Sequence, residues 1–533
     1  MPDVLDLLIR GGQVIDGTGA PAFRADVGVR GDRIAEIGSL GGHAATRTIE
    51  AGDLFVCPGF IDMHTHSDVQ LLVHPEHDCK VRQGVTLEVL GQDGLSYAPS
   101  TPEVIAQLRR QLVGWNDDPP GLDWEFRDID EFLRRFDDRV AVNVAYLVPH
   151  GTLRMIAVGL DDRPATEAEL EVMRRLVAEG MEQGAVGLSS GLMYAPGMFA
   201  SDDELVELCR AMRPYGGYYC PHHRNYGLRA IESYAECIEI ARRADVPLHL
   251  AHAHVSFPCN RGRASELLSM IDRARGAGMD VSFDAYPYTA AATYLSGILP
   301  GWTSEGGHRA TLERLADVAQ RERLRVALEE TGSDGFHDLT VDWTSIVISG
   351  VRRPDHQRWV GMNIADAARA AERRPIDFVC ELLASEDLGV SALLHIGIEE
   401  NVRTMLSHPA QMGGSDGILV GARPHPRGWG AFARYFAMYV RELGLVSWEE
   451  MVRRLTSSAA ARLGLSDRGR LRAGMAADIV CFDPTTVRDT ATYETPRSYP
   501  EGIPYVLVNG AVVIDNGGHT GALPGRALRR RGR

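Results

Sequence analysis

Two histidines stand one residue apart at the end of an apolar run near the start of the chain. Residues 58–66 read PGFIDMHTH. Side chains alternate along a β-strand, so His64 and His66 point to the same face and Thr65 points to the other. Two imidazoles on one face can bind one divalent cation. The His-x-His pair alone is weak evidence, but its position at a strand end favours a metal site over a structural pair.

Three further groups that can bind a metal follow other apolar runs. Asp93 lies in the segment GQDG, His222 in PHHR and His252 in LAHAH. Each of them alone would more often be a polar turn residue or a hydrogen-bonded structural histidine. Loops at one end of a parallel barrel meet in space, so ligands of one ion need not be close in sequence. Together with the His-x-His pair, these residues predict a metal centre.

An aspartate follows the last apolar run of this series. Asp416 lies in the segment GGSDG at residues 413–417. This composition also favours a simple Asx-type turn. The histidines favour a catalytic role, in which the carboxylate accepts a proton from a metal-activated water and later returns it to a leaving amine. We therefore predict a hydrolase.

The elements that must position these residues are strands alternating with helices. Between residues 59 and 460, apolar segments alternate with segments of helical periodicity, a pattern typical of βαβ units. The first strand-to-helix turn lacks a GxGxxG loop, which favours a closed (β/α)8 barrel over an open doubly wound sheet. The eight predicted barrel strands are Phe60–His66, Val85–Gly91, Val140–Pro149, Ala185–Leu192, Gly217–His222, Val246–Ala253, Asp280–Tyr286 and Gln411–Asp416.

Both ends of the chain have the pattern of β-hairpins. Short apolar runs are separated by Gly and Asp turns in residues 7–49, and the pattern returns after residue 478 with a turn at Asn509-Gly510. We predict a β-sandwich built from residues 1–58 and 461–533, with the metal-dependent barrel over 59–460. The stretch from about 287 to 410 is too long for one crossover and predicts an inserted subdomain, with a further strand near Ser391–Gly397.

The composition restricts the partners of the protein. The formal net charge of −16 leaves no basic field for nucleic acid or an anionic membrane. No stretch of about twenty apolar residues is present, and the N-terminus carries acids where a signal peptide needs basic residues. We expect a cytoplasmic protein that acts on a small molecule, without a nucleic-acid or membrane partner. The oligomeric state stays open, a homo-oligomer included.

Seven short motifs follow one another along nearly the whole chain. They are DGTG at 16–19, PGFID at 58–62, SSGL at 189–192, YAPG at 194–197, DAYPY at 284–288, GSDG at 414–417 and HPR at 425–427. In this order they resemble the N-acyl-D-amino-acid deacylases (D-aminoacylases) of the amidohydrolase superfamily. The resemblance implies a β-sandwich and a barrel that together form a zinc enzyme for N-acyl amides.

The resemblance also assigns roles to the candidate metal and catalytic residues. By motif match, His222 and His252 are ligands of a tightly held ion, and His64 and His66 line a second, weaker position. One or two zinc ions are therefore expected. Asp416 matches the catalytic aspartate of the family.

The resemblance further implies a carboxylate-bearing substrate. Arg427 matches the anchor for the α-carboxylate, a role that suits a planar guanidinium, and Tyr194 and Tyr286 match pocket positions. Two departures put simple N-acyl-D-amino acids in doubt. His254 stands where the family has a lysine, and Ala292 stands where a pocket serine is expected.

A third departure leaves the metal open. Asp93 stands where the family carries a metal-binding cysteine. A carboxylate is a harder ligand than a thiolate and also tolerates Mn²⁺ or another divalent cation. Preference for D- or L-substrates stays open as well. Three functions remain: an N-acyl amino acid hydrolase, a cyclic amide or imide hydrolase or D-dipeptidase with the same apparatus, and a non-catalytic assembly protein that has lost its ion.

Overall fold

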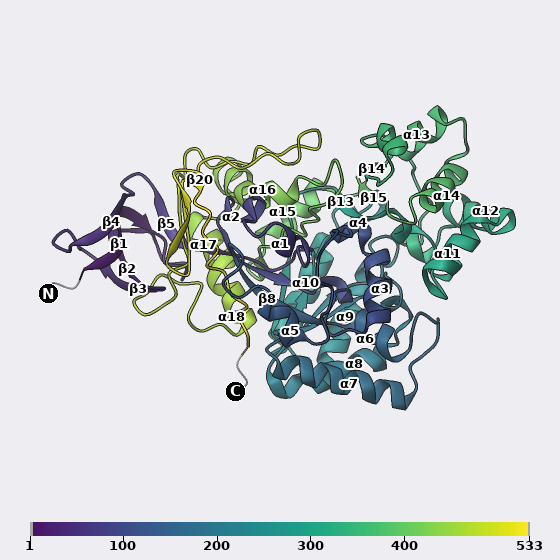
Figure 1. The fold of residues 1–533 in the computed structure, drawn as a ribbon, viewed down its shortest axis with the longest axis horizontal. Helices are drawn as coiled ribbons and strands as arrows, with labels where there is room; N and C mark the ends of the chain where they lie inside the picture. The colour runs from purple at the N-terminus through teal and green to yellow at the C-terminus, as the bar shows by residue number, and fades with distance from the viewer. Residues whose placement is uncertain (1–3, 531–533) are drawn as a thin grey trace.

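The centre of the molecule is a parallel sheet of eight strands. The computed structural model describes residues 4–530 (Figure 1). The sheet has the order β16-β12-β11-β10-β9-β8-β7-β6. Each strand falls inside one predicted segment, and the predicted barrel architecture is confirmed. The strands are β6 (Phe60–Asp62), β7 (Val85–Leu90), β8 (Asn143–Pro149), β9 (Gly187–Gly191), β10 (Tyr218–His222), β11 (Leu248–Leu250), β12 (Val281–Asp284) and β16 (Gln411–Met412).

The barrel closes between its first and last strands. The backbone N–H of Met63 donates to Gly413 O at 2.9 Å, and the N–H of His66 donates to Gly417 O at 3.0 Å. The N–H of Asp416 donates to His64 O at 2.8 Å in the same stretch. The strand itself ends at Asp62, earlier than predicted, because the following residues pair only intermittently with 413–417.

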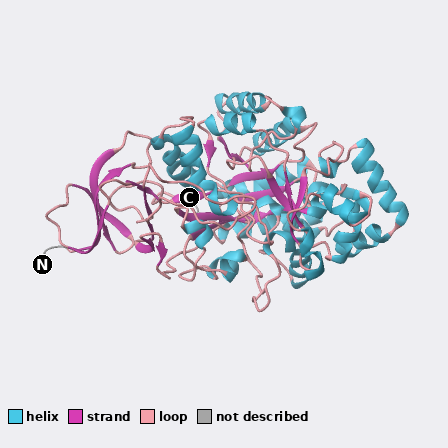
Figure 2. Cartoon of the chain, turned by 90° about the horizontal axis from the view of Figure 1, so that it is seen from above, coloured by secondary structure: helices cyan, strands magenta, loops and turns pink. Residues whose placement is uncertain are grey.

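Helices cover the outside of the barrel. They include α7 (Glu167–Glu182), α8 (Asp202–Met212), α9 (Ala230–Ala244) and α10 (Ala264–Gly276), and Figure 2 shows helices around the central strands. The first of these illustrates how the sequence forms them. Thr166 and Glu169 make a capping box at its start, and Met173, Val177 and Met181 recur at helical spacing and are buried.

The two chain ends share one sheet at the side of the barrel. This nine-stranded sheet has the order β20-β19-β18-β17-β5-β1-β2-β3, with β4 paired to β1. Besides β5 and β17, its strands are β1 (Leu5–Val14), β2 (Phe23–Arg30), β3 (Arg33–Gly38), β4 (Ala45–Glu50), β18 (Tyr505–Val508), β19 (Ala511–Asp515) and β20 (Gly518–His519). β5 (Phe55–Pro58) pairs antiparallel with β17 (Ile479–Phe482), so the N-terminal and C-terminal strands join directly. A separate apolar core, which includes Ile9, Val27 and Leu507, lies on this sheet. The two ends therefore fold together, as predicted.

The predicted insertion is a small subdomain with its own core. β13 (Ala291–Tyr294), β14 (Ile346–Gly350) and β15 (Ser391–Leu394) form a three-stranded sheet in the order β13-β15-β14. The strand predicted near residues 391–397 is β15. Four helices accompany the sheet at the right of Figure 1: α11 (Gly307–Ala316), α12 (Val318–Arg325), α13 (Ile364–Ala370) and α14 (Pro375–Ser385). Buried residues such as Leu315 and Val379 form this core.

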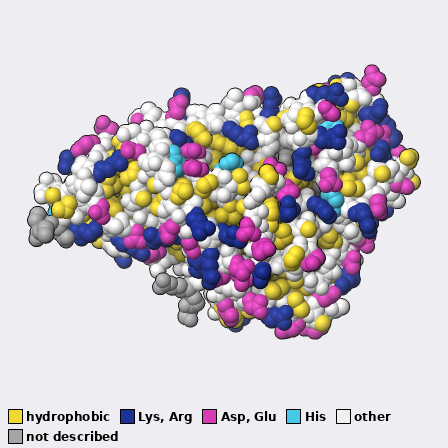
Figure 3. Space-filling view, viewed as in Figure 1, with side chains coloured by type: hydrophobic (Ala, Val, Ile, Leu, Met, Phe, Trp, Pro, Cys, Tyr) yellow, Lys and Arg dark blue, Asp and Glu magenta, His cyan; other side chains and the backbone are white. Residues whose placement is uncertain are grey.

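The surface agrees with the charge balance of the sequence. Acidic and basic side chains are interspersed over the face shown in Figure 3, with no broad basic patch on that face. Among the described residues, no helix is both long and apolar enough to cross a membrane.

Candidate active site

The predicted ligands and the predicted catalytic aspartate converge at the C-terminal end of the barrel. All of them are nearly inaccessible to solvent. They come from five different strand ends, where the mouth of a barrel places functional residues. His64 and His66 follow β6, Asp93 lies in the turn after β7, His222 ends β10, His252 follows β11, and Asp416 follows β16.

Asp93 lies at the centre of the histidines. Its Oδ2 is 3.1 Å from His222 Nδ1, and its Oδ1 is 3.4 Å from His252 Nε2 and 3.5 Å from His64 Nε2. Zinc binds nitrogen and oxygen at about 2.0–2.1 Å, which separates neighbouring ligands of a tetrahedral ion by roughly 3.3 Å. The spacing of His64, Asp93 and His252 therefore fits one ion, while the His222 nitrogen faces the other carboxylate oxygen of Asp93.

A second group of potential ligands lies beside the first. Asp416 Oδ1 is 3.2 Å from His66 Nε2 and 3.7 Å from His64 Nε2. In each of the two groups, His64-Asp93-His252 and His64-His66-Asp416, the ligand atoms lie within 4.8 Å of one another. Because His64 belongs to both groups, the geometry accommodates one ion or two neighbouring ions.

Several polar atoms in this cluster lack a hydrogen-bond partner. Both ring nitrogens of His64, Oδ1 of Asp93 and Nε2 of His222 are buried and unsatisfied. Buried polar atoms without partners are rare in folded proteins, because each one costs desolvation free energy. A divalent cation would satisfy Asp93 Oδ1 and one nitrogen of each histidine, so the residues fit a metal.

Three of the converging residues have left-handed backbone. The φ angles are 53° at Asp93, 28° at His252 and 49° at Asp416. Such angles are costly for residues other than glycine and cluster at functional sites. Gly414 shows how tightly the last turn packs, since a Cβ there would lie 2.4 Å from Asp284 Oδ1.

The charges of the site favour a cation. Burial opposes a charge on His64, but Asp284 and Asp93 together raise its pKa to about 9. Burial also opposes ionisation of Asp93, yet His222 and His252 hold the pKa of its carboxyl well below the usual value. Burial lowers the pKa of His222 to about 4, so its lone pair is free at neutral pH.

Two residues that the sequence analysis did not identify orient the imidazoles. Asp284 ends β12, and its Oδ2 is 3.2 Å from His249 Nε2 and 3.6 Å from His64 Nδ1. The hydroxyl of Tyr226 is 2.7 Å from His252 Nδ1. Such partners hold metal-binding histidines in one orientation. Asp284 could have been found from its place at a strand end, whereas Tyr226 lies in a loop without a local signal.

The only lysine among the 533 residues lies buried below the predicted metal site. Lys80 Nζ donates to Asp62 Oδ2 at 2.8 Å, Thr65 Oγ1 at 2.9 Å, Glu88 Oε1 at 2.7 Å and Ser415 Oγ at 3.0 Å. Ser415 immediately precedes the predicted catalytic aspartate. A compact ammonium can donate in several directions to these acceptors, whereas the planar fork of arginine cannot. The sequence could have revealed this position, because all the other basic Lys/Arg positions of the chain are arginines.

His77 completes this buried charge cluster. Its Nε2 is 2.9 Å from Glu88 Oε2. Burial alone would lower the pKa of His77, but Glu88 raises it to about 10. Burial alone would raise the pKa of Glu88, but His77 and Lys80 lower it to about 2. Glu88 and His77 are therefore both ionised at neutral pH.

The residues predicted to bind substrate surround Asp416. Tyr194 and Tyr286 line a narrow cavity together with His66, Asp93 and Asp416. Arg427, the first residue of α16 (Arg427–Arg434), is fully buried, and its Nη1 is 2.9 Å from Asp416 Oδ2. Its guanidinium lies 4.5 Å from the centre of the Tyr286 ring.

Neither Arg427 nor His254 is part of the cavity lining. The imidazole of His254 stacks against Tyr286, with ring centres 4.0 Å apart. Burial, helped by His252 and Arg427, lowers the pKa of His254 to about 3, so it is neutral at pH 7. The remaining lining residues are Trp115, Met193, His222, Tyr226, His252, Ser256, Ala291, Ala292, Thr293, His337, Leu394 and Ile396.

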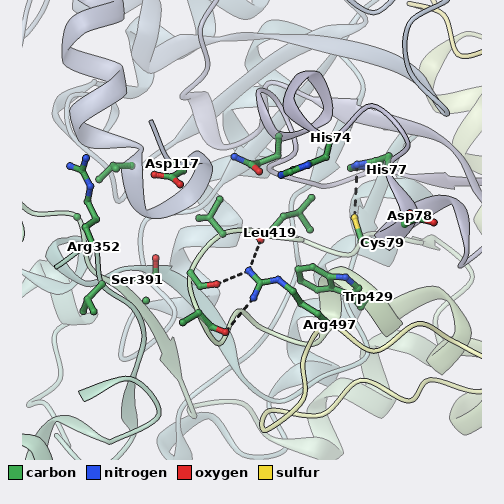
Figure 4. Close-up of a pocket in the computed structure, with 18 of the residues that line it drawn as sticks. His74, His77, Asp78, Cys79, Asp117, Arg352, Ser391, Leu419, Trp429 and Arg497 are labelled. Carbon is green, nitrogen blue, oxygen red and sulfur yellow. Dashed lines mark hydrogen bonds between the residues drawn. The ribbon is translucent and has the colours of Figure 1, made fainter. Parts of the chain in front are cut away.

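A larger cavity of about 800 Å³ lies elsewhere, beside the 419–422 loop (Figure 4). Arg497 in its wall donates to the backbone carbonyls of Leu419, Gly421 and Ala422. Asp78 in its lining pairs with Arg82 and His77 pairs with Glu88, and the charged side chains labelled in Figure 4 do not converge on one point. We therefore place the chemistry in the narrower cavity, where ligands and catalytic groups meet.

A barrel with converging histidines and carboxylates at its C-terminal mouth defines a metal-dependent hydrolase. The amidohydrolase family model matches residues 47–514, and the chain belongs to this family. The D-aminoacylase of Alcaligenes xylosoxydans xylosoxydans is 37% identical over 98% of both chains, and the N-acyl-D-glutamate deacylase of the same organism is 36% identical over 99% of this chain and 98% of its own. A solved structure of the N-acyl-D-glutamate deacylase from Bordetella bronchiseptica contains zinc and a phosphonate mimic of the tetrahedral intermediate. Its sequence is 33% identical to this chain, and the match covers 99% of this chain and 100% of that one, with a TM-score of 0.85.

Proposed function

We propose that this protein is a zinc-dependent hydrolase of N-acyl-D-amino acids. The observation that carries the proposal is the contact of Asp93 with three histidines, with Asp416 at the edge of the same cluster. The relatives that match 98–99% of the chain are named as a D-aminoacylase and an N-acyl-D-glutamate deacylase, and both names describe cleavage of an N-acyl amide bond. We infer a cytoplasmic enzyme with a small-molecule substrate.

Asp416 is the proposed general base and acid. Burial opposes its ionisation, but Arg427, followed by His66, holds the pKa of its carboxyl well below the usual value, so it is a carboxylate at neutral pH. A divalent cation bound by this cluster would supply Lewis acidity and lower the pKa of a water molecule. As the water oxygen adds to the carbonyl carbon, Asp416 takes a proton, and it returns that proton to the nitrogen when the C–N bond breaks.

Arg427 is the proposed anchor for the substrate carboxylate. Its Nη2 lies 3.4 Å from the carbonyl oxygen of Ala292, next to the cavity wall. Its Nε is inaccessible to solvent and makes no hydrogen bond, so an anion that reached it would satisfy a buried donor. With His254 in place of lysine and Ala292 in place of serine, this arginine carries most of the recognition of the carboxylate.

One screen tests the proposal. Purified protein loaded with Zn²⁺ or Mn²⁺ is assayed on N-acyl-D-amino acids, N-acyl-L-amino acids, dipeptides and cyclic amides. We expect metal-dependent release of carboxylate from the N-acyl-D-amino acids. Turnover of cyclic amides alone would favour a ring-opening enzyme, and no turnover on any of them would refute an amide hydrolase.

A further inference from the structure

One histidine from the inserted subdomain reaches the active-site cavity. His337 follows the short turn of Asp334–Phe336, and its backbone is left-handed, with a φ of 61°. The side chain is buried and lines the same cavity as Asp93 and Asp416. The insertion therefore contributes a polar group directly to the catalytic chamber.

The hydrogen bonding of His337 fixes its tautomer. The backbone N–H of Tyr226 donates to His337 Nδ1 at 3.3 Å. A protonated imidazolium has no acceptor nitrogen, so the ring is neutral and its proton lies on Nε2. Within residues 4–530, His337 Nε2 makes no hydrogen bond and is not among the inaccessible polar atoms. This N–H is thus a free donor in the wall of the cavity.

His337 lies on the side of the site that holds His222 and His252. Its ring centre is 5.3 Å from that of Tyr226, which is 5.4 Å from His222. Tyr226 also contacts His252 through its hydroxyl, at 2.7 Å. His337 therefore lines the same cavity as these two predicted ligands, on the side where Tyr226 contacts both of them.

Contacts on both sides hold this histidine in place. The backbone N–H of Leu228 donates to His337 O at 3.2 Å. The next residue, Asp338, accepts from Asn225 Nδ2 at 2.7 Å and from Arg229 Nε at 2.6 Å. Hydrogen bonds therefore hold the 225–229 loop and the 337–338 segment together. The Nε2–H of His337 is fixed in position by these contacts and needs little reorganisation when charge develops on the substrate.

The other donors of the cavity are mostly engaged. The hydroxyl of Tyr194 pairs with Thr293 Oγ1 at 3.1 Å, and that of Tyr226 pairs with His252. The Tyr286 hydroxyl interacts with Arg427, and the indole N–H of Trp115 is inaccessible and has no hydrogen-bond partner. Ser256 carries the remaining hydroxyl of the lining, and it makes no hydrogen bond between described residues. Between described residues no hydrogen bond joins the Ser256 side chain to Tyr226, whereas the His337 ring contacts Tyr226, which contacts both His222 and His252.

We propose that His337 is a catalytic residue whose Nε2–H donates to the oxygen of the scissile carbonyl. The inference rests on the proposed amide hydrolysis. When the water oxygen bonds to the carbonyl carbon, the electron pair of the C=O bond moves to oxygen, and His337 stabilises that negative charge. When the C=O bond re-forms, the C–N bond breaks, and the nitrogen takes its proton from Asp416. His337 keeps its own proton throughout.

The test compares three variants of metal-loaded full-length protein. His337→Phe removes the donor, His337→Gln retains an N–H group, and His308→Gln is the control, because His308 belongs to the same insertion and pairs with Asp387. We expect His337→Phe to lower kcat by about 100-fold or more with KM changed far less, as for loss of one oxyanion donor. His337→Gln should recover part of the loss, and His308→Gln should match wild type.

Metal content, circular dichroism and inhibition by a phosphonate analogue of an N-acyl-D-amino acid complete the test. Metal content should stay at the wild-type value, and phosphonate affinity should weaken in proportion to kcat/KM. If His337→Phe does not fold, His337→Gln decides the matter, with a partial loss of kcat and of phosphonate affinity expected. If every folded His337 variant has the wild-type kcat and the wild-type phosphonate affinity, or if Ser256→Ala lowers kcat instead, this inference is wrong and the proposed function is unaffected. An inactive wild-type enzyme would overturn the proposed function and this inference together.

Discussion

Replacing the single lysine by methionine should destabilise the protein severely. The Lys80→Met change removes four hydrogen bonds and leaves Asp62 and Glu88 buried with only His77 as a cationic partner. Removing one partner of a buried ion pair costs about 3–5 kcal/mol, since the remaining charge keeps its desolvation cost. The cost is a large part of a typical free energy of unfolding, which is about 5–15 kcal/mol.

Urea unfolding, followed by circular dichroism at pH 7, measures this change. Arg309→Met is the matched control, because the Arg309 side chain is 93% exposed and its loss should change the free energy of unfolding by less than about 0.5 kcal/mol. A second substitution, Asp62→Asn, should restore part of the stability of Lys80→Met, because it removes the carboxylate left without a cation, whereas Glu88 still pairs with His77. A loss below about 1 kcal/mol for Lys80→Met, with no recovery in the double variant, would refute the reasoning.

Asp416→Asn should retain zinc, as measured by elemental analysis. It should lower kcat by about 1,000-fold or more, because the amide of asparagine cannot take up the proton of the water. An unchanged kcat would show that Asp416 is not part of the mechanism. Asp93→Cys should increase the preference for Zn²⁺ over Mn²⁺ in competition titrations, since thiolate is the softer ligand, and an unaltered ratio would contradict Asp93 as a ligand. The lowered pKa of Glu88 and the raised pKa of His77 predict two limits of stability. The contribution of Glu88 to the free energy of unfolding should be lost as pH falls from about 4.5 towards 2, and that of His77 as pH rises from about 6.5 to 10. Urea unfolding across this range checks both. His77→Gln should reduce the alkaline loss by the part that belongs to His77, while His64, whose pKa is also raised, keeps its own part.

The sequence by itself determined the architecture and most of the candidate metal centre. Strand and helix periodicities are local, so the eight barrel strands could be located, although the strand before His64 ends earlier than predicted. The ligands could be selected because a parallel barrel brings its strand ends together. His222 and His252 therefore follow from local patterns, even though they come from different strands.

Only the tertiary structure decided which groups touch. The central position of Asp93, the pairing of Arg427 with Asp416 and the approach of His337 from the insertion join residues far apart in the chain. The same holds for Lys80 and Ser415, which are 335 positions apart. Such contacts depend on how side chains of different elements pack in the folded state, and no local periodicity encodes that packing.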